Sequence, residues 1–83
     1  MTGHIHRRDD VSPKEGLHEH GDVPYADPTN KKYPIENADH VRSAWSYINH
    51  PHNAEKYSKD EVKTIKDRIR RAAKKFDVEI STD

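Results

Sequence analysis

The sequence predicts a mainly α-helical domain, in which a two-helix hairpin at about residues 37–49 and 59–76 is covered by an extended arm at about residues 25–35. Two observations predict this fold. Apolar residues recur at helical spacing in both helical segments, and each segment follows a residue that caps helices well. In addition, a chain of 83 residues with 30% hydrophobic and 36% charged residues has room for one small core.

The first 23 residues are predicted to form a disordered leader. Their few apolar side chains are widely spaced, and Pro13 and three glycines interrupt them. Such a segment buries too little surface to offset its ordering entropy, roughly 1–2 kcal/mol per residue for the backbone. A helical turn near 12–17, capped by Ser12, is marginal in isolation. We therefore expect a leader at 1–23, a helical domain at 24–80 and a disordered tail at 81–83.

The arm begins where the composition changes, at Tyr25. Residues 27–30, Asp-Pro-Thr-Asn, predict a turn, because proline presets φ and the Asp and Asn side chains bond nearby backbone. Pro34 favours extended geometry at Tyr33 and cannot donate to a neighbouring strand. We therefore expect a packed extended arm, rather than a central strand, with its aromatic residues against the helices.

The first helix of the hairpin follows Asn37, which is a good cap. Its apolar residues recur at i, i+3, i+4 and i+7 and form one stripe: Val41, Ala44, Trp45 and Ile48. The helix should end near Asn49, because Pro51 disfavours helical geometry at the residue before it. Trp45 is the only tryptophan, and we expect the core to assemble around it.

The second helix begins after Ser58, where Glu61 three residues later completes a capping box. A helical stripe then continues for about five turns through Val62, Ile65, Ile69, Ala72, Ala73 and Phe76. Residues 50–57 between the helices are expected to be a polar loop, held to the core by Tyr57. A small core of this kind predicts modest stability and a monomer or weak dimer.

Composition excludes several classes of protein. The chain has no cysteine, so neither disulfides nor a cysteine-containing zinc cluster can stabilise the fold. No apolar run approaches the roughly 20 residues that span a bilayer, and the N-terminus lacks the apolar segment of a secretory signal. The formal net charge is zero, which argues against binding of nucleic acid by bulk charge alone. We expect a cytoplasmic protein without a cofactor or a membrane partner.

Residues 25–76 carry a set of motifs in a fixed order: Tyr-Ala-Asp-Pro at 25–28, Lys-Tyr-Pro-Ile at 32–35, His-Val-Arg at 40–42, Ala-Trp at 44–45 and Tyr-Ser at 57–58. In these motifs the chain resembles a small uncharacterised domain family of bacterial and phage proteins, some of whose members are appended to larger phage-related proteins. The resemblance implies a fold and a prophage context, and it carries over no catalytic residue. The expected terminating glycine is replaced by Asp77.

The leading functional interpretation is a non-enzymatic interaction or accessory module that contacts another protein. Three polar residues of the first helix are the candidate contacts: His40, Arg42 and Tyr47. Tyr47 lies off the apolar stripe, so we expect it to be exposed. His40 could act as a general base, but no serine, cysteine or carboxylate converges on it in the sequence, and we predict no enzymatic activity.

The alternative interpretation is an accessory domain that binds nucleic acid through its basic second helix. The candidate residues are Lys63, Lys66, Arg70, Arg71, Lys74 and Lys75, with Trp45 or the tyrosines available for base stacking if exposed. The same charges also suit the helix dipole and ordinary i,i+4 ion pairs. A helix-turn-helix is disfavoured because the loop between the helices is too long.

Histidine pairs of the form His-x-His occur three times, at 4 and 6, 18 and 20, and 50 and 52. In an extended chain, residues two apart point to the same side, so each pair could chelate zinc, nickel or copper. A structural zinc site normally needs four ligands in fixed geometry. We therefore assign no metal site, and His18 and His20 remain the candidates.

Overall fold

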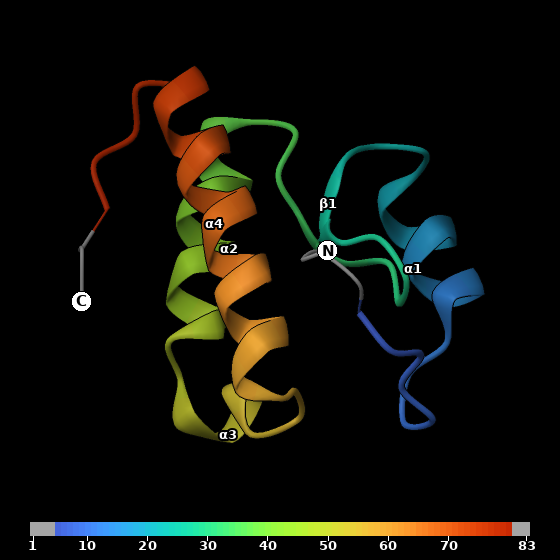
Figure 1. Cartoon of the computed structure of the whole chain (residues 1–83). Helices are drawn as coiled ribbons and strands as arrows, with labels where there is room; N and C mark the ends of the chain where they lie inside the picture. Colours follow the sequence, from blue (N-terminus) through green and yellow to red (C-terminus); the bar gives the residue numbers. More distant parts are fainter. Residues whose placement is uncertain (1–4, 81–83) are drawn as a thin grey trace.

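The computed structural model describes residues 5–80, and about half of the chain is helical. The described residues form α1 (Pro13–His20), β1 (Tyr25–Asp27), β2 (Lys32–Pro34), α2 (Ala38–Ile48), α3 (Pro51–Ala54) and α4 (Lys59–Lys75). Helices α2 and α4 lie side by side, and α1 lies to one side of this pair, beyond the strands (Figure 1). A mainly α-helical fold with a small two-stranded sheet is therefore observed.

The predicted caps set the starts of the two long helices. The Asn37 side chain accepts a hydrogen bond of 2.8 Å from the backbone N–H of His40 at the start of α2. At the start of α4, Ser58 and Glu61 form the predicted capping box, with bonds of 3.2 Å and 2.8 Å. These bonds satisfy backbone donors that have no partner within a helix, so each helix begins where the sequence indicates.

Helix α4 ends through a left-handed residue, although the sequence has no glycine there. Asp77 has a φ of 56° and takes the position that glycine usually fills. The backbone N–H of Val78 then reaches the Ala73 carbonyl at 2.8 Å, and that of Asp77 reaches the Lys74 carbonyl at 3.3 Å. Because of this turn, Val78 folds back and is buried in the core.

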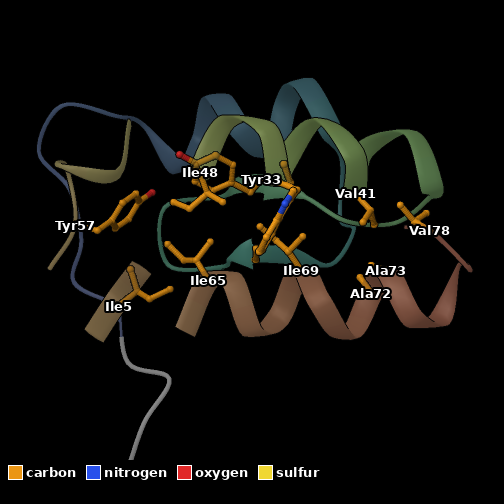
Figure 2. Packing of buried hydrophobic residues seen from close by; sticks show 13 residues of the cluster. Ile5, Tyr33, Val41, Ile48, Tyr57, Ile65, Ile69, Ala72, Ala73 and Val78 are labelled. Atoms are coloured by element: carbon orange, nitrogen blue, oxygen red, sulfur yellow. The ribbon is translucent and has the colours of Figure 1, made fainter. Parts of the chain in front are cut away.

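The core lies between α2 and α4 (Figure 2). Val41 and Ile48 from α2 face Ile65 and Ile69 from α4, and all four side chains are fully buried. Trp45 is only 6% exposed. The predicted apolar stripes therefore pack against each other. The linker between the helices differs from the predicted loop, because Pro51–Ala54 form α3, for which His50 provides the N-cap.

The predicted extended arm at 25–35 is a two-stranded antiparallel hairpin. Tyr25 pairs with Pro34 and Asp27 pairs with Lys32. Lys31, at the end of the turn, has a positive φ of 54°. Tyr33 has a φ of 61° although it lies within β2, so the extended geometry predicted there from Pro34 is wrong, because the short hairpin fixes the backbone at this position. Since the sheet has only two strands, Pro34 needs no further strand partner, and proline is tolerated in such an edge position.

The structure also differs from the predicted disordered leader over residues 5–23. Ile5 is 1% exposed within the core, and α1 begins after Ser12, whose side chain accepts from the Glu15 backbone. The apolar surface of this segment is small, but hydrogen bonds to distant residues also hold it, such as the one from the Arg8 backbone N–H to Asn30 Oδ1 at 2.6 Å. The predictions for residues 1–4 and 81–83 lie outside the described residues.

Candidate functional site

A groove of about 800 Å³ lies between α1, β2 and α2. Its walls come from the segment before α1, from α1 itself, from the second strand and its turn, and from one side of α2. The lining residues are Asp9, Asp10, Val11, Ser12, Glu15, Gly16, Glu19, His20, Lys31, Lys32, Tyr33, Pro34, His40, Ser43, Ala44 and Tyr47. Two of the three predicted contact residues, His40 and Tyr47, are therefore in one groove.

Helix α1 forms the outer wall and is held by close backbone contact with the hairpin. A Cβ atom built on Gly16 would lie 2.4 Å from the Lys31 carbonyl oxygen, so only glycine allows this approach. The Tyr25 hydroxyl donates to the Gly21 carbonyl at 2.7 Å and lies 3.3 Å from the Gly16 carbonyl. Since no residue of α1 is buried, these contacts position the wall.

Two histidines close one end of the groove. The rings of His20 in α1 and His40 in α2 meet edge to face, with centroids 6.2 Å apart. His40 Nδ1 lies 2.5 Å from Glu36 Oε1. Burial raises the pKa of Glu36, but hydrogen bonds from His40 and from the backbone outweigh it, and the net pKa is below its ordinary value. The carboxylate therefore fixes the orientation of the His40 ring.

The groove carries more negative than positive charge. Four carboxylates line it (Asp9, Asp10, Glu15 and Glu19), against two lysines (Lys31 and Lys32). Of these, Asp10 forms a bidentate ion pair with Arg8 at 2.5 Å and 2.9 Å, and this hydrogen bonding lowers the pKa of Asp10 to about 2. The remaining three carboxylates belong to exposed residues.

The three predicted contact residues do not form one surface. Tyr47 is 58% exposed, as its position off the apolar stripe predicts, and it lies at the edge of the groove beside Ala44. Arg42 instead pairs with Asp39 at 2.9 Å and is absent from the groove lining. Residues 42 and 47 are five positions apart on α2, which is about 140° around the helix. Arg42 is therefore separated from the other two.

A buried polar network that the sequence analysis missed supports the turn of the hairpin. Asp27 and Asn30 are fully buried, and Asn30 Nδ2 donates to Asp27 Oδ2 at 2.9 Å. The Tyr57 hydroxyl donates to the same carboxylate oxygen at 2.7 Å, while Arg8 Nη1 donates to the Tyr57 oxygen at 3.0 Å. Burial, followed by the bond to Asp27, raises the pKa of Tyr57 well above its ordinary value. The Asp-Pro-Thr-Asn turn was its only signal in the sequence.

Comparison with family models gives one match over residues 1–83, to the Family of unknown function (DUF6582). The chain belongs to this family. The match extends beyond residues 25–76, which carry the motifs of the resemblance. Comparisons with curated proteins and with solved structures found no match. The DUF6582 assignment therefore supports a small domain family and leaves its activity to be argued from the site.

Among the described residues of this DUF6582 chain, His40 and Glu36 form a shorter histidine–carboxylate pair than His20 with Glu19 or His52 with Glu55. A carboxylate beside a histidine is part of many hydrolytic sites, in which a nucleophile contacts the other ring nitrogen. In residues 5–80, no hydrogen bond joins the His40 ring to a serine or threonine hydroxyl. The arrangement orients the ring at the end of the groove, and a reaction would need a nucleophile from elsewhere.

The predicted metal candidates lie on α1, where their geometry is helical rather than extended. Residues two apart on a helix point about 200° from each other, so His18 and His20 cannot chelate one ion as they would in an extended segment. Among the described residues, no three His, Cys, Asp or Glu side chains are arranged to hold a metal ion. His50 Nδ1 instead accepts from the His52 backbone at 3.3 Å and caps α3.

The basic residues of the nucleic-acid alternative lie on the outer side of α4. Lys66 Nζ and the Arg70 guanidinium lie over the Trp45 ring, 5.7 Å and 5.1 Å from its centroid. Because Trp45 is buried beneath them, it cannot stack on a nucleic-acid base as the sequence analysis had allowed. Arg70 also pairs with Asp67 at 3.1 Å, at i,i+3 rather than at the expected i,i+4 spacing. In the described part of this DUF6582 chain, no helix could cross a membrane.

Proposed function

We propose that the protein is a non-enzymatic interaction module, and that the groove between α1 and α2 binds a positively charged segment of another protein. The observation that carries this proposal is the exposed Tyr47 ring at the edge of an acidic groove. Exposed tyrosines are frequent anchors of protein interfaces, because one large ring offers both apolar contact and a hydroxyl.

Charge favours a basic segment over an acidic or neutral one. The exposed carboxylates of Glu15 and Glu19 belong to one wall, and Asp9 belongs to the end of the groove near α1. Lys31 is drawn toward the Tyr25 ring, with its Nζ 5.8 Å from the centroid. Lysine or arginine side chains of a partner would therefore find carboxylates along the α1 wall, which aids orientation and speeds encounter.

The floor of the groove offers apolar contact to the same partner. Tyr33, Pro34 and Ala44 lie on the β2 and α2 side, opposite the carboxylates of α1. A partner helix with one apolar and one basic face would match both sides, in the manner of helix-in-groove recognition. The partner we propose is thus an amphipathic basic segment rather than a small molecule.

Photo-cross-linking tests the proposal in the native host. A photoreactive phenylalanine analogue in place of Tyr47 should give a cross-linked protein that survives nuclease treatment. The same analogue in place of Ser46 is the matched control, because Ser46 is also exposed on α2 but does not line the groove. We expect the cross-link from position 47 alone.

Charge reversal then tests whether the protein that cross-links at position 47 lies in the groove or contacts Tyr47 from outside it. Glu15→Lys with Glu19→Lys should abolish the cross-link from position 47, whereas the exposed change Glu79→Lys, at a residue outside the groove, should leave it intact. A cross-link that persists in the double variant, or one that disappears with nuclease, would contradict a basic protein segment in the groove. The prophage context expected from the resemblance is a separate proposal, tested by the neighbouring genes.

A further inference from the structure

Five cations on α4 form a straight row, which we call the basic row: Lys59, Lys63, Lys66, Arg70 and Lys74. Their spacing of four, three, four and four residues keeps them within about 80° of the helix circumference. The row runs for about 22 Å, with a cation every 4.5–6 Å or so along the axis. Two basic residues of the sequence prediction, Arg71 and Lys75, lie about 100° and 140° away from the middle of the row.

The basic row is open to solvent and mostly unneutralised. Four of its residues are exposed, and Lys66 is half-buried against Trp45. Within residues 5–80, Arg70 is the only member that forms an ion pair, with Asp67. Ion pairs at i,i+4 were one part of the simpler interpretation of the sequence, and they do not explain these cations. The helix dipole was the other part, and within the row it favours only Lys74, in the last turn of α4.

Contacts with the Trp45 ring hold the two residues in the middle of the row. Lys66 and Arg70 lie over the Trp45 ring from α2, where cation–π attraction orders two long and otherwise mobile side chains. Ordering before binding lowers the entropy lost on binding. The row thus has a fixed centre between Lys66 and Arg70, with solvent-exposed lysines at both ends.

We propose that the basic row binds the phosphodiester backbone of nucleic acid without reading its sequence. Phosphates repeat every 3.4 Å or so along each strand of a duplex, so about 22 Å of cations can contact four or five of them. Among residues 5–80, no aromatic ring is exposed beside the row for stacking, since the row itself covers Trp45. Recognition through charge alone is the chemistry that remains.

The composition of this side of α4 favours nucleic acid over an acidic protein. Residues 59, 60, 63, 66, 67, 70, 71 and 74 are all charged, so the side offers no apolar centre. Protein interfaces are depleted in charge at their centres, whereas nucleic-acid interfaces are strongly positive. The row lies over Trp45, whereas Tyr47 lines the groove. Because these two residues point about 200° apart on α2, the row and the groove are separate surfaces.

Salt dependence of binding tests the proposal on the whole chain. The probe is a labelled mixed-sequence DNA duplex of about 20 base pairs, with an RNA duplex of equal length as a second arm, titrated between about 50 and 200 mM salt. Four or five phosphate contacts predict a slope of log Kobs against log salt of about −4. Emission of Trp45, the only tryptophan, should change over the same titration because Lys66 and Arg70 lie on its ring.

Two double variants with the same change in net charge make the test specific. Lys63→Gln with Lys74→Gln removes two members of the row and should bring the slope to about −2. Arg71→Gln with Lys75→Gln removes two exposed cations outside the row and should leave the slope near −4. All four side chains are exposed, so both variants should fold, which circular dichroism checks.

Several other outcomes would overturn the proposal. Equal losses in the two variants would mean that net charge acts without the row. Absence of binding at about 50 mM salt would remove nucleic acid as the ligand. Poly-glutamate could also displace the labelled duplex at the same concentration of negative charges as unlabelled DNA does. That result would identify an acidic protein as the partner instead. Similar slopes with DNA and RNA support backbone recognition, whereas binding of one sequence alone would contradict it.

Discussion

Tyr57 donates a hydrogen bond of 2.7 Å to the carboxylate of Asp27, and both side chains are buried although 30 residues separate them in the chain. The bond joins the start of α4 to the end of β1. Arg8 reaches the same hydroxyl from the N-terminal segment and lies over the Tyr57 ring, 5.0 Å from its centroid. Three parts of the fold therefore meet at one phenol.

Removing this hydroxyl should lower stability measurably. Tyr57→Phe keeps the ring but leaves the buried Asp27 carboxylate one donor short, a loss of about 1–3 kcal/mol in the free energy of unfolding. Tyr47→Phe removes an exposed hydroxyl and should change it by less than about 0.5 kcal/mol. Urea denaturation followed by circular dichroism measures both. Equal stability of the two variants would show that the network contributes nothing.

The burial of Ile5 leads to a second prediction, which distinguishes a packed N-terminal segment from a disordered leader. Ile5→Ala should cost about 2–5 kcal/mol, because Ile5 is 1% exposed and truncation leaves a cavity. Leu17→Ala in α1 is the matched control, since Leu17 is 42% exposed and should cost less than about 0.5 kcal/mol. If Ile5→Ala has wild-type stability in urea, the N-terminal segment does not pack as described.

Acid should destabilise the protein through Glu61. Burial raises the pKa of this carboxyl, but hydrogen bonds from the His6 and Ser58 backbone outweigh it, so the folded pKa lies below the ordinary 4.5. Its contribution to stability is therefore complete above about pH 4.5 and is lost as the pH falls through the folded pKa. The lowered pKa values of Asp10, caused first by its bond to Arg8, and of Glu36 act in the same direction.

Urea midpoints across this range test the assignment. The wild-type midpoint should fall between about pH 6 and pH 3. Glu61→Gln should lose about 1–3 kcal/mol at pH 6 and then fall less steeply, because its stability no longer depends on that proton. The exposed Glu79→Gln serves as the control and should follow the wild type. A Glu61→Gln profile parallel to the wild type would contradict the role of this carboxylate.

Replacing Gly16 by alanine should change stability in the direction opposite to that expected from helix propensity. Alanine in place of a helical glycine usually stabilises a helix by up to about 1 kcal/mol. Here the new Cβ would meet the Lys31 carbonyl, and backbone cannot move aside cheaply. Gly16→Ala should therefore displace α1, with faster amide exchange in residues 13–20 and a net loss of about 1–3 kcal/mol. Lys14→Ala on the exposed side of α1 should leave both unchanged.

The parts of the fold that the sequence predicted are those determined by neighbouring residues. Helical spacing placed Val41 and Ile48 in the core, and the caps at Asn37 and Ser58 set both helix starts within the sequence itself. The same spacing left Tyr47 outside the apolar stripe, and Tyr47 is exposed. Local rules suffice for such features because the interacting residues are within four positions of each other.

The features that sequence analysis missed depend on contacts between distant segments. Ile5 is a single apolar residue among polar ones, and no periodic pattern marks it as buried. The groove exists because Gly16 lets α1 approach Lys31, a contact that neither residue indicates alone. Asp27 and Asn30 were predicted as turn residues, and the structure confirms this. Their burial, however, depends on Tyr57, which is far along the chain.

The backbone N–H of His6 donates at 2.7 Å to the carboxylate of Glu61, a partner 55 positions later in the chain. During synthesis, the N-terminal segment must therefore wait for the first turn of α4 to leave the ribosome before it can adopt its native position. At about 5–20 residues per second, this delay lasts several seconds. In a refolding experiment the whole chain is present from the start, so this segment should dock without that delay. The delay in docking should therefore occur only during synthesis in the cell.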